Sequence, residues 1–168
     1  MMRNAAFWLF AALFLSGCAS EYSWRSKVPD DMRTVSVPVF RNETDITGFG
    51  TVAARQLLRE FQREGTFRVA GKDDCAIEIQ GLVKKTSSTM GYDRSTGGRV
   101  SKFTLDAEVE ITVVDKRNGK LLMDNKSYTA KTTFMSNDDY LTGRRDASGR
   151  LAEDLARQVV DDVLTLKW

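Results

Sequence analysis

The clearest hydrophobic pattern in this chain is a strict two-residue alternation over residues 100–115. Every second side chain in the middle of this segment is apolar, and Thr, Asp or Glu fills the positions between them. The apolar positions are Phe103, Leu105, Ala107, Val109, Ile111 and Val113. An alternation of this period predicts a β-strand with one buried face and one solvated face.

An Asn-Gly pair follows this strand and predicts a tight hairpin. Asn118 and Gly119 supply the positive φ angles that two-residue turns require. Residues 121–135 are therefore expected to return as an antiparallel neighbour. The alternation in this returning strand slips near Asp124 and Asn125, which predicts a β-bulge at that point.

Two earlier segments are also predicted to be strands, over residues 34–40 and 75–85. The apolar residues on one face of the first are Val35, Val37 and Val39. Pro38 lies on its other face. Because proline has no amide hydrogen to donate to a neighbouring strand, we expect the first segment at a sheet edge or at a bulge.

Two segments have the three- and four-residue spacing of amphipathic helices. Over residues 47–63 the apolar stripe consists of Ala53, Ala54, Leu57, Leu58 and Phe61. Gly65 follows this segment, as glycine commonly does just past the last turn of a helix. Over residues 151–166 the stripe consists of Leu151, Leu155, Val159, Val163 and Leu166. Residues 86–99 and 136–148 are polar and are expected to be loops.

The predicted order of elements is strand, helix, three strands and helix. Elements with one apolar face each are buried most simply when the helices cover one side of a sheet. We therefore expect an α+β fold: a single four-stranded, mostly antiparallel sheet with two helices packed on one face. Residues 33–168 are long enough to form this structure as one domain.

The first residues have the pattern of a bacterial lipoprotein signal peptide. Arg3 precedes an apolar run over residues 5–15, which is shorter than the roughly 20 residues that a membrane span needs. Leu15-Ser16-Gly17-Cys18 then resembles a lipobox, whose cysteine receives a diacylglycerol and an N-acyl chain. We expect residues 1–17 to be removed, Cys18 to be lipidated, and residues 18–32 to form a tether.

This anchor predicts where the protein resides. A cysteine that carries several acyl chains holds a protein durably at a membrane. The residue after Cys18 is Ala19 rather than Asp, and by similarity to the sorting rule of enteric bacteria this favours the outer membrane. The domain is then expected to face the periplasm. We expect no cofactor besides the covalent acyl chains.

Composition argues against several classes of function. The chain has no histidine, so it lacks the commonest general base and the commonest metal ligand. Its 25 basic and 23 acidic residues leave a net charge of +2, which gives no reason to expect nucleic-acid binding. With Cys18 assigned to lipid, Cys75 has no partner within the chain. We expect it to be buried as a small apolar residue, with an intermolecular disulfide as the alternative.

The order of elements behind a lipobox resembles the lipopolysaccharide (LPS) assembly lipoproteins, the LptE-type partners of the outer-membrane LPS translocon. The local similarity lies in Tyr22-Ser23-Trp24 and in residues 35–44, Val-Ser-Val-Pro-Val-Phe-Arg-Asn-Glu-Thr. This resemblance implies a protein that is not an enzyme. It implies instead a domain that assembles with a β-barrel translocon, plugs it, and contacts LPS during insertion into the outer leaflet.

Regulatory periplasmic lipoproteins are the alternative interpretation. Activators of peptidoglycan synthases and secretin-associated factors also use small strand-and-helix domains. An activator must reach across the periplasm, whereas the expected tether here has only about 15 residues. The short tether therefore favours a partner in the same membrane.

Basic residues near apolar groups are the candidates for contact with LPS phosphates. A hairpin loop over residues 86–99 would bring the end of one strand beside the start of the next, and a further lysine of the last strand near that end. The candidate LPS-binding residues are Lys84, Lys85, Arg94, Arg99, Lys102 and Lys131. The alternative is an ordinary solvated loop whose charges serve only solubility.

Overall fold

The computed structural model describes residues 28–92, 101–136 and 139–168. The expected signal peptide, Cys18 and most of the expected tether lie outside these ranges. The helices are α2 (Phe49–Glu64) and α3 (Tyr140–Leu164), and a 3-10 turn, η2, spans Asp30–Met32. The strands are β1 (Thr34–Ser36), β2 (Arg41–Asn42), β3 (Arg68–Val69), β4 (Ile77–Tyr92), β5 (Ser101–Asp115) and β6 (Lys120–Ser136).

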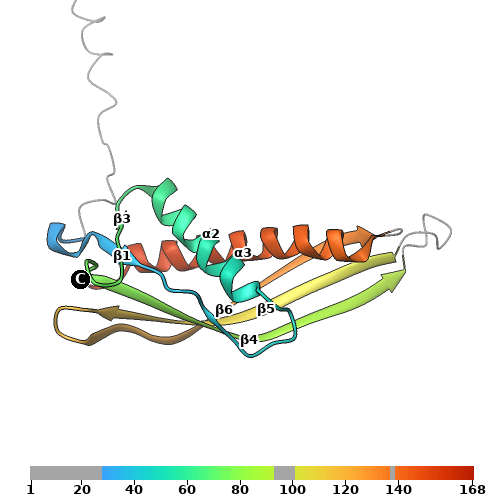
Figure 1. Cartoon of the computed structure of the whole chain (residues 1–168), viewed down its shortest axis with the longest axis horizontal. Coiled ribbons are helices and arrows are strands. Elements are labelled where there is room, and N and C mark those ends of the chain that lie inside the picture. The colour runs from blue at the N-terminus through green and yellow to red at the C-terminus, as the bar shows by residue number, and fades with distance from the viewer. Residues whose placement is uncertain (1–27, 93–100, 137–138) are drawn as a thin grey trace, which may run out of the picture.

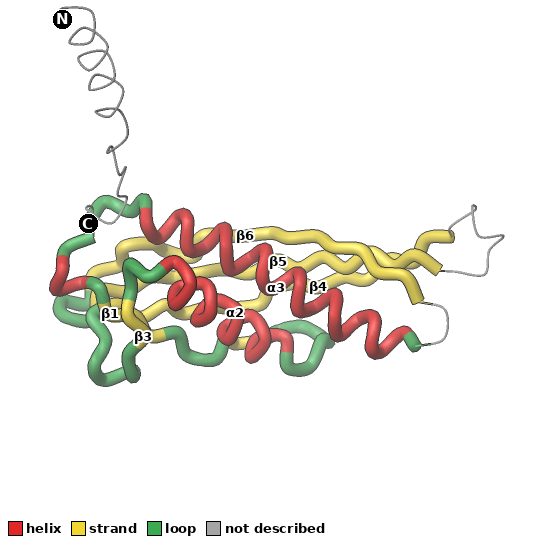
Figure 2. Tube along the Cα trace, turned by 90° about the horizontal axis from the view of Figure 1, so that it is seen from above, coloured by secondary structure: helices red, strands yellow, loops and turns green. Residues whose placement is uncertain are grey.

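The strands form one mixed sheet in the order β3-β1-β4-β5-β6, with β2 also paired to β4. β1 and β2 run parallel to β4, whereas β5 is antiparallel to both β4 and β6. Both helices lie on one face of the sheet, and α3 runs along its length (Figure 1; Figure 2). The expected α+β class with both helices on one face is confirmed. The expectation of four mostly antiparallel strands is wrong, because the described residues form six strands in a mixed sheet.

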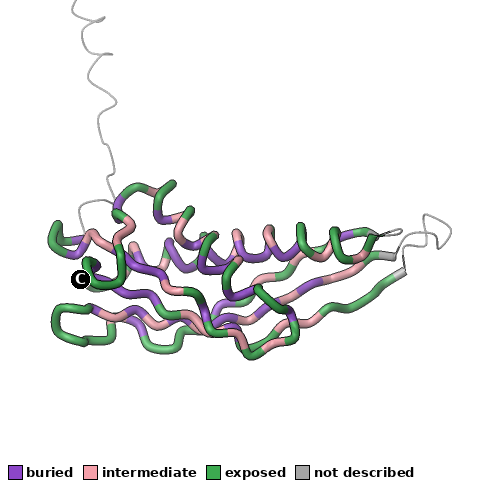
Figure 3. The backbone as a smooth tube through the Cα atoms, viewed as in Figure 1, coloured by how far each residue is buried: buried purple, intermediate pink, exposed green. Residues whose placement is uncertain are grey.

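The core lies between the helices and the sheet, as Figure 3 shows. The alternating apolar residues of β5 from Leu105 to Val113 all point into it, and Val109 is only 2% exposed. Leu57 and Phe61 of α2 are buried against this face. The core also includes Val28 and Met32, so the described end of the segment expected to be a tether packs with the domain.

The expected first strand, 34–40, is wrong at its carboxyl end. Only its first three residues form a strand, β1, which lies between β3 and β4 rather than at an edge, and the next strand, β2, begins only at Arg41. Pro38 falls in the gap between these two strands, where no amide donor is needed. Val39 is 65% exposed, whereas the neighbouring Phe40 is buried. The two-residue alternation is lost where the proline interrupts the strand.

Two segments expected to be loops are regular structure. β4 continues to Tyr92 because its Ser and Thr residues pair with β5 along their whole length. Helix α3 begins at Tyr140, where the Asp139 carboxylate accepts a hydrogen bond from Thr142 N at 3.0 Å. The polar composition of these two segments gave no sign of regular structure, because the end of β4 and the start of α3 are stabilised by pairing and packing with neighbouring elements.

Other local predictions are confirmed. Gly65 ends α2 with φ of 82°. The hairpin between β5 and β6 is formed, but its connection spans residues 116–119, and of the Asn118-Gly119 pair only Gly119 has a positive φ, 71°. The register between β5 and β6 shifts beside Asn125, which has φ of 43°. Cys75 is free and buried, as expected of a small apolar residue.

Candidate functional site

Of the expected cluster of basic residues, the lysines that the structure describes are spread along the sheet rather than gathered at one end. Lys85 pairs in register with Glu108, whereas Lys102 pairs with Gly91. Lys85 and Gly91 are six residues apart, which corresponds to about 20 Å along β4. The premise that a loop brings Lys84 and Lys85 beside Lys102 is therefore wrong. Arg94 and Arg99 lie outside the described residues, so LPS binding by this set stays a prediction.

The lysines of this set that lie in mid-strand have acidic neighbours. Lys84 forms an ion pair with Glu43, with 3.6 Å between Nζ and Oε2. Lys131 pairs in register with Asp106, as Lys85 does with Glu108. These pairs lie on the face of β4, β5 and β6 that is turned away from the helices. We call this surface the outer sheet face; it is polar and nearly balanced in charge.

Hydroxyl groups extend this polar character across the strands. Ser87 Oγ donates to the Asp106 carboxylate at 2.9 Å, and Ser127 Oγ donates to Glu108 at 2.9 Å. Thr129 is exposed and pairs in register with Glu108. A broad face of this kind presents hydrogen-bonding groups to a polar partner rather than to lipid.

The far end of the three long strands has a different composition. Phe103, Phe134 and Tyr140 pack together, with ring centroids 4.8 to 5.7 Å apart. Met90 and Met135 beside them are 52% and 59% exposed. This end, which we call the distal tip, thus combines exposed apolar side chains with the cation of Lys102.

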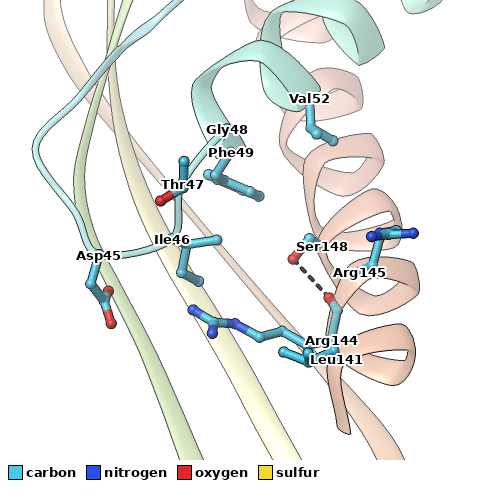
Figure 4. A pocket seen from close by; sticks show the side chains of 10 residues that line it. All are labelled: Asp45, Ile46, Thr47, Gly48, Phe49, Val52, Leu141, Arg144, Arg145 and Ser148. Atoms are coloured by element: carbon cyan, nitrogen blue, oxygen red, sulfur yellow. Dashed lines mark hydrogen bonds between the residues drawn. The ribbon is translucent and has the colours of Figure 1, made fainter. Parts of the chain in front are cut away.

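A cleft of about 450 Å³ lies between the loop that leads into α2 and the first turns of α3 (Figure 4). Ile46, Val52 and Leu141 supply apolar walls, and Arg144 and Arg145 supply two positive charges. We call it the interhelix cleft.

Backbone geometry at the start of α2 forms one wall of this cleft. Gly48 precedes the helix with φ of 81°, a left-handed conformation that favours glycine. Gly50 lies so close to the preceding strand segment that a Cβ there would be 2.4 Å from the Phe40 carbonyl oxygen. These two glycines let the chain turn sharply into α2 and leave space in front of α3.

The electrostatics of the interhelix cleft favour an anion. Arg144 Nε is buried and has no hydrogen-bond partner. Neither Arg144 nor Arg145 belongs to an ion pair in the part of the chain that the structure describes. Asp45 also lines the cleft, but its Oδ1 accepts a hydrogen bond from Thr86 at 3.2 Å. The cleft therefore holds an unpaired guanidinium, the group best suited to a phosphate or carboxylate.

Sequence reasoning missed this cleft because it assigned residues 136–148 to a loop. The sequence offered one signal for a basic site here, the adjacent arginines Arg144 and Arg145, because consecutive side chains of an amphipathic helix point in different directions. Only the folded chain brings Arg144 opposite Ile46, almost one hundred positions earlier in the sequence.

Two further properties concern membranes and metals. No helix within residues 28–92, 101–136 and 139–168 is long and apolar enough to cross a membrane. The same ranges contain no group of His, Cys, Asp and Glu residues that would hold a metal ion.

The sequence profile of the LptE family, described as lipopolysaccharide-assembly, matches residues 32–163. This match covers most of the chain and includes every strand and nearly all of both helices. The chain belongs to the LptE family. Members of this family are outer-membrane lipoproteins that take part in LPS assembly and are not enzymes, so the expected family is confirmed.

Solved structures support the fold of this LptE-family protein. A putative lipoprotein from Caulobacter crescentus is 15% identical, with a TM-score of 0.57, over 80% of this chain and 90% of that one. A minor lipoprotein from Acinetobacter baumannii is 13% identical, with a TM-score of 0.53, over 80% and 96%. A protein from Xanthomonas campestris is 12% identical, with a TM-score of 0.52, over 82% and 88%. No curated protein matches the chain significantly.

Proposed function

We propose that this protein is an outer-membrane lipoprotein, anchored by acyl chains on Cys18, that assembles with a β-barrel LPS translocon. It plugs the barrel from the periplasmic side and assists insertion of LPS into the outer leaflet. The observation that carries this proposal is the LptE-family match over residues 32–163. The same match favours LPS assembly over the regulatory lipoproteins that the fold class alone left open.

The outer sheet face suits contact with the inside of a barrel. The lumen of large outer-membrane barrels is polar, and this face presents the opposite-charge pairs Lys85/Glu108 and Asp106/Lys131 together with exposed hydroxyls. Polar groups on both partners can then form hydrogen bonds directly or through water. An apolar face would not be matched by such a lumen.

The distal tip suits contact with LPS. LPS combines phosphates with acyl chains, so its recognition needs cations next to apolar surface. Met90 and Met135 supply exposed apolar surface there, and Lys102 is exposed at the start of β5. We propose that the tip, together with the predicted residues Arg94 and Arg99, contacts LPS.

Co-purification tests the assembly. The full-length chain with a carboxyl-terminal tag is isolated from detergent-solubilised outer membranes, and co-purifying barrels are quantified by mass spectrometry. We expect one large integral barrel in near-stoichiometric amount. If no barrel co-purifies with the unsubstituted chain, the assembly proposal fails.

A pair of matched substitutions tests which surface plugs the barrel. Thr129→Trp places an indole on the outer sheet face, and Gln62→Trp places the same group on the exposed side of α2. We expect Thr129→Trp to remove the barrel from the purified fraction and Gln62→Trp to retain it, with both thermal melts nearly unchanged. Equal retention by both variants would show that the outer sheet face does not contact the barrel.

A further inference from the structure

We infer that the interhelix cleft is a binding site for a lipid phosphate, with Arg144 as the residue that contacts the phosphoryl oxygens. The site is separate from both the outer sheet face and the distal tip. The inference deepens the proposed function and rests on it only for the setting, an envelope membrane in which lipid phosphates are abundant. All other support for the inference comes from the geometry and charge of the cleft itself.

The first step is the unsatisfied donor. Arg144 extends from α3 towards the loop at Ile46 (Figure 4), and its Nε is buried without a partner. Buried N–H groups in folded proteins nearly always have an acceptor, because leaving one unpaired costs free energy. An acceptor atom brought by a ligand into the cleft would satisfy this group.

The second step is the sign of the charge. Among the described residues, two arginines line the cleft against one carboxylate, that of Asp45, which accepts a hydrogen bond from Thr86. The first turn of α2, which forms the opposite wall, has no acidic residue. The field inside the cleft is therefore positive, and an arginine fork matches the tetrahedral oxygens of a phosphoryl group.

The third step is the apolar wall. Leu141 is 72% exposed at the mouth of the cleft, and Ile46 and Val52 continue the apolar surface inward. A free phosphate would leave this surface in water, whereas an acyl chain attached to the phosphate would cover it. The lining belongs to the 45–48 loop and the two helices, so the cleft offers no strand edge to an extended acidic peptide. These features favour a lipid phosphate over either alternative.

The cleft provides its own spectroscopic reporter for a test. The full-length lipoprotein in non-ionic detergent is labelled with nitrogen-15, and the Arg144 Nε–H resonance is followed during titration. The probes are inorganic phosphate, dihexanoyl phosphatidic acid, dihexanoyl phosphatidylcholine and a hexaglutamate peptide. We expect a saturable shift with phosphatidic acid, a shift at higher concentration with phosphate, and little response to the other two probes.

Substitutions assign the effect to the cleft. Arg144→Gln should weaken binding of phosphatidic acid by at least about tenfold, because a charge-assisted hydrogen bond is lost. Asp45→Asn should strengthen it, because a carboxylate that lines the cleft becomes neutral. Leu141→Asn should weaken binding of phosphatidic acid and leave phosphate unchanged. The control is Arg55→Gln on the exposed side of α2, which should change the binding of neither phosphatidic acid nor phosphate. Binding to all these variants is followed through the backbone amide resonances of residues 46–52.

Several results would overturn the inference. Equal weakening by Arg144→Gln and Arg55→Gln would indicate general charge attraction, and equal affinity for phosphate and phosphatidic acid would remove the role of the apolar wall. Tighter binding of hexaglutamate would indicate a protein ligand. Barrel co-purification with the Arg144→Gln variant separates this inference from the proposed function. We expect the variant to retain the barrel. If the unsubstituted chain itself retains no barrel, the assembly proposal fails, but the titration of the cleft remains a valid test.

Discussion

The aromatic ring of Phe40 lies directly against the Cα of Gly81 on the core face of β4. A Cβ at position 81 would be 2.4 Å from Phe40 Cγ, far closer than atoms approach. Phe40 is 5% exposed and occupies the space that a side chain at position 81 would need. The ring thus joins the β1–β2 segment to the central strand of the sheet.

Gly81→Ala should therefore destabilise the protein by about 1–3 kcal/mol, because the ring or the strand must shift to make room. Urea unfolding followed by circular dichroism measures the change. Gly149→Ala is the control, since a Cβ there meets no atom within 4 Å. Within helix α3 that change should stabilise by about 0.5–1 kcal/mol. A neutral Gly81→Ala would contradict this packing.

Val109→Asp should unfold the domain. Val109 is 2% exposed in the middle of β5, and an unpaired carboxylate buried there should cost several kcal/mol. The measurement is a thermal melt. Thr133→Asp, at an exposed position of β6, should change the melting temperature little. Equal effects of the two substitutions would mean that the core face is assigned wrongly.

Acid stability should depend on Asp115. This carboxylate is 3% exposed. It accepts hydrogen bonds from the Arg117 backbone N and side chain at 3.0 to 3.1 Å. Side-chain hydrogen bonds from Arg117 hold the pKa of Asp115 below its ordinary value of 3.8, despite burial, which raises it. The stabilisation is complete above the ordinary pKa and is lost as pH falls through the lower folded-state value.

Arg117→Gln should raise the pKa of Asp115 and move acid unfolding to higher pH. At pH 7 it should destabilise the protein by about 1–3 kcal/mol, because the buried carboxylate of Asp115 loses the hydrogen bonds from the Arg117 guanidinium. Urea melts between pH 7 and pH 2 provide the test. Arg157→Gln breaks only exposed ion pairs on α3, so we expect little change in stability. Identical acid profiles for the two variants would refute the role of Asp115.

Cys18→Ser should abolish lipidation. The lipobox-like sequence Leu-Ser-Gly-Cys motivates this expectation, and labelled palmitate incorporation with membrane fractionation tests it. Cys75→Ser is the matched control: Cys75 is buried, and its substitution should leave palmitate labelling intact. Label that persists in the Cys18→Ser protein would exclude lipidation at this position.

Replacing Arg94, Arg99 and Lys102 by Ala should weaken LPS binding while leaving the thermal melt nearly unchanged. Each charge-assisted contact to a phosphate contributes about 1.5–3 kcal/mol if partly desolvated, and much less if exposed. The control is a triple replacement on α2, of Arg55, Arg59 and Arg63. Binding of the full-length protein to immobilised LPS is the measurement. Equal losses in both triples would indicate bulk electrostatics rather than a site at the distal tip.

The sequence by itself determined the elements whose signals are local. The alternation in β5, the Asn-Gly hairpin and Gly65 at the end of α2 depend on neighbouring residues, and all three are found in the structure. The class of fold followed from these one-faced elements. The family resemblance rested on the element order and on residues 35–44, and the profile match over residues 32–163 confirms it.

Only the tertiary structure decided the features that depend on contacts between distant residues. β1, β2 and β3 have two or three residues each, too few to show a period. β1 and β2 exist because β4 offers them hydrogen-bonding partners, and β3 because it pairs with β1. The polar second half of β4 is a strand because β5 pairs with it throughout. Arg144 meets Ile46 because the helices pack on the same face of the sheet. A pattern along the chain records which side of an element is apolar, but the partner of that side is selected by packing.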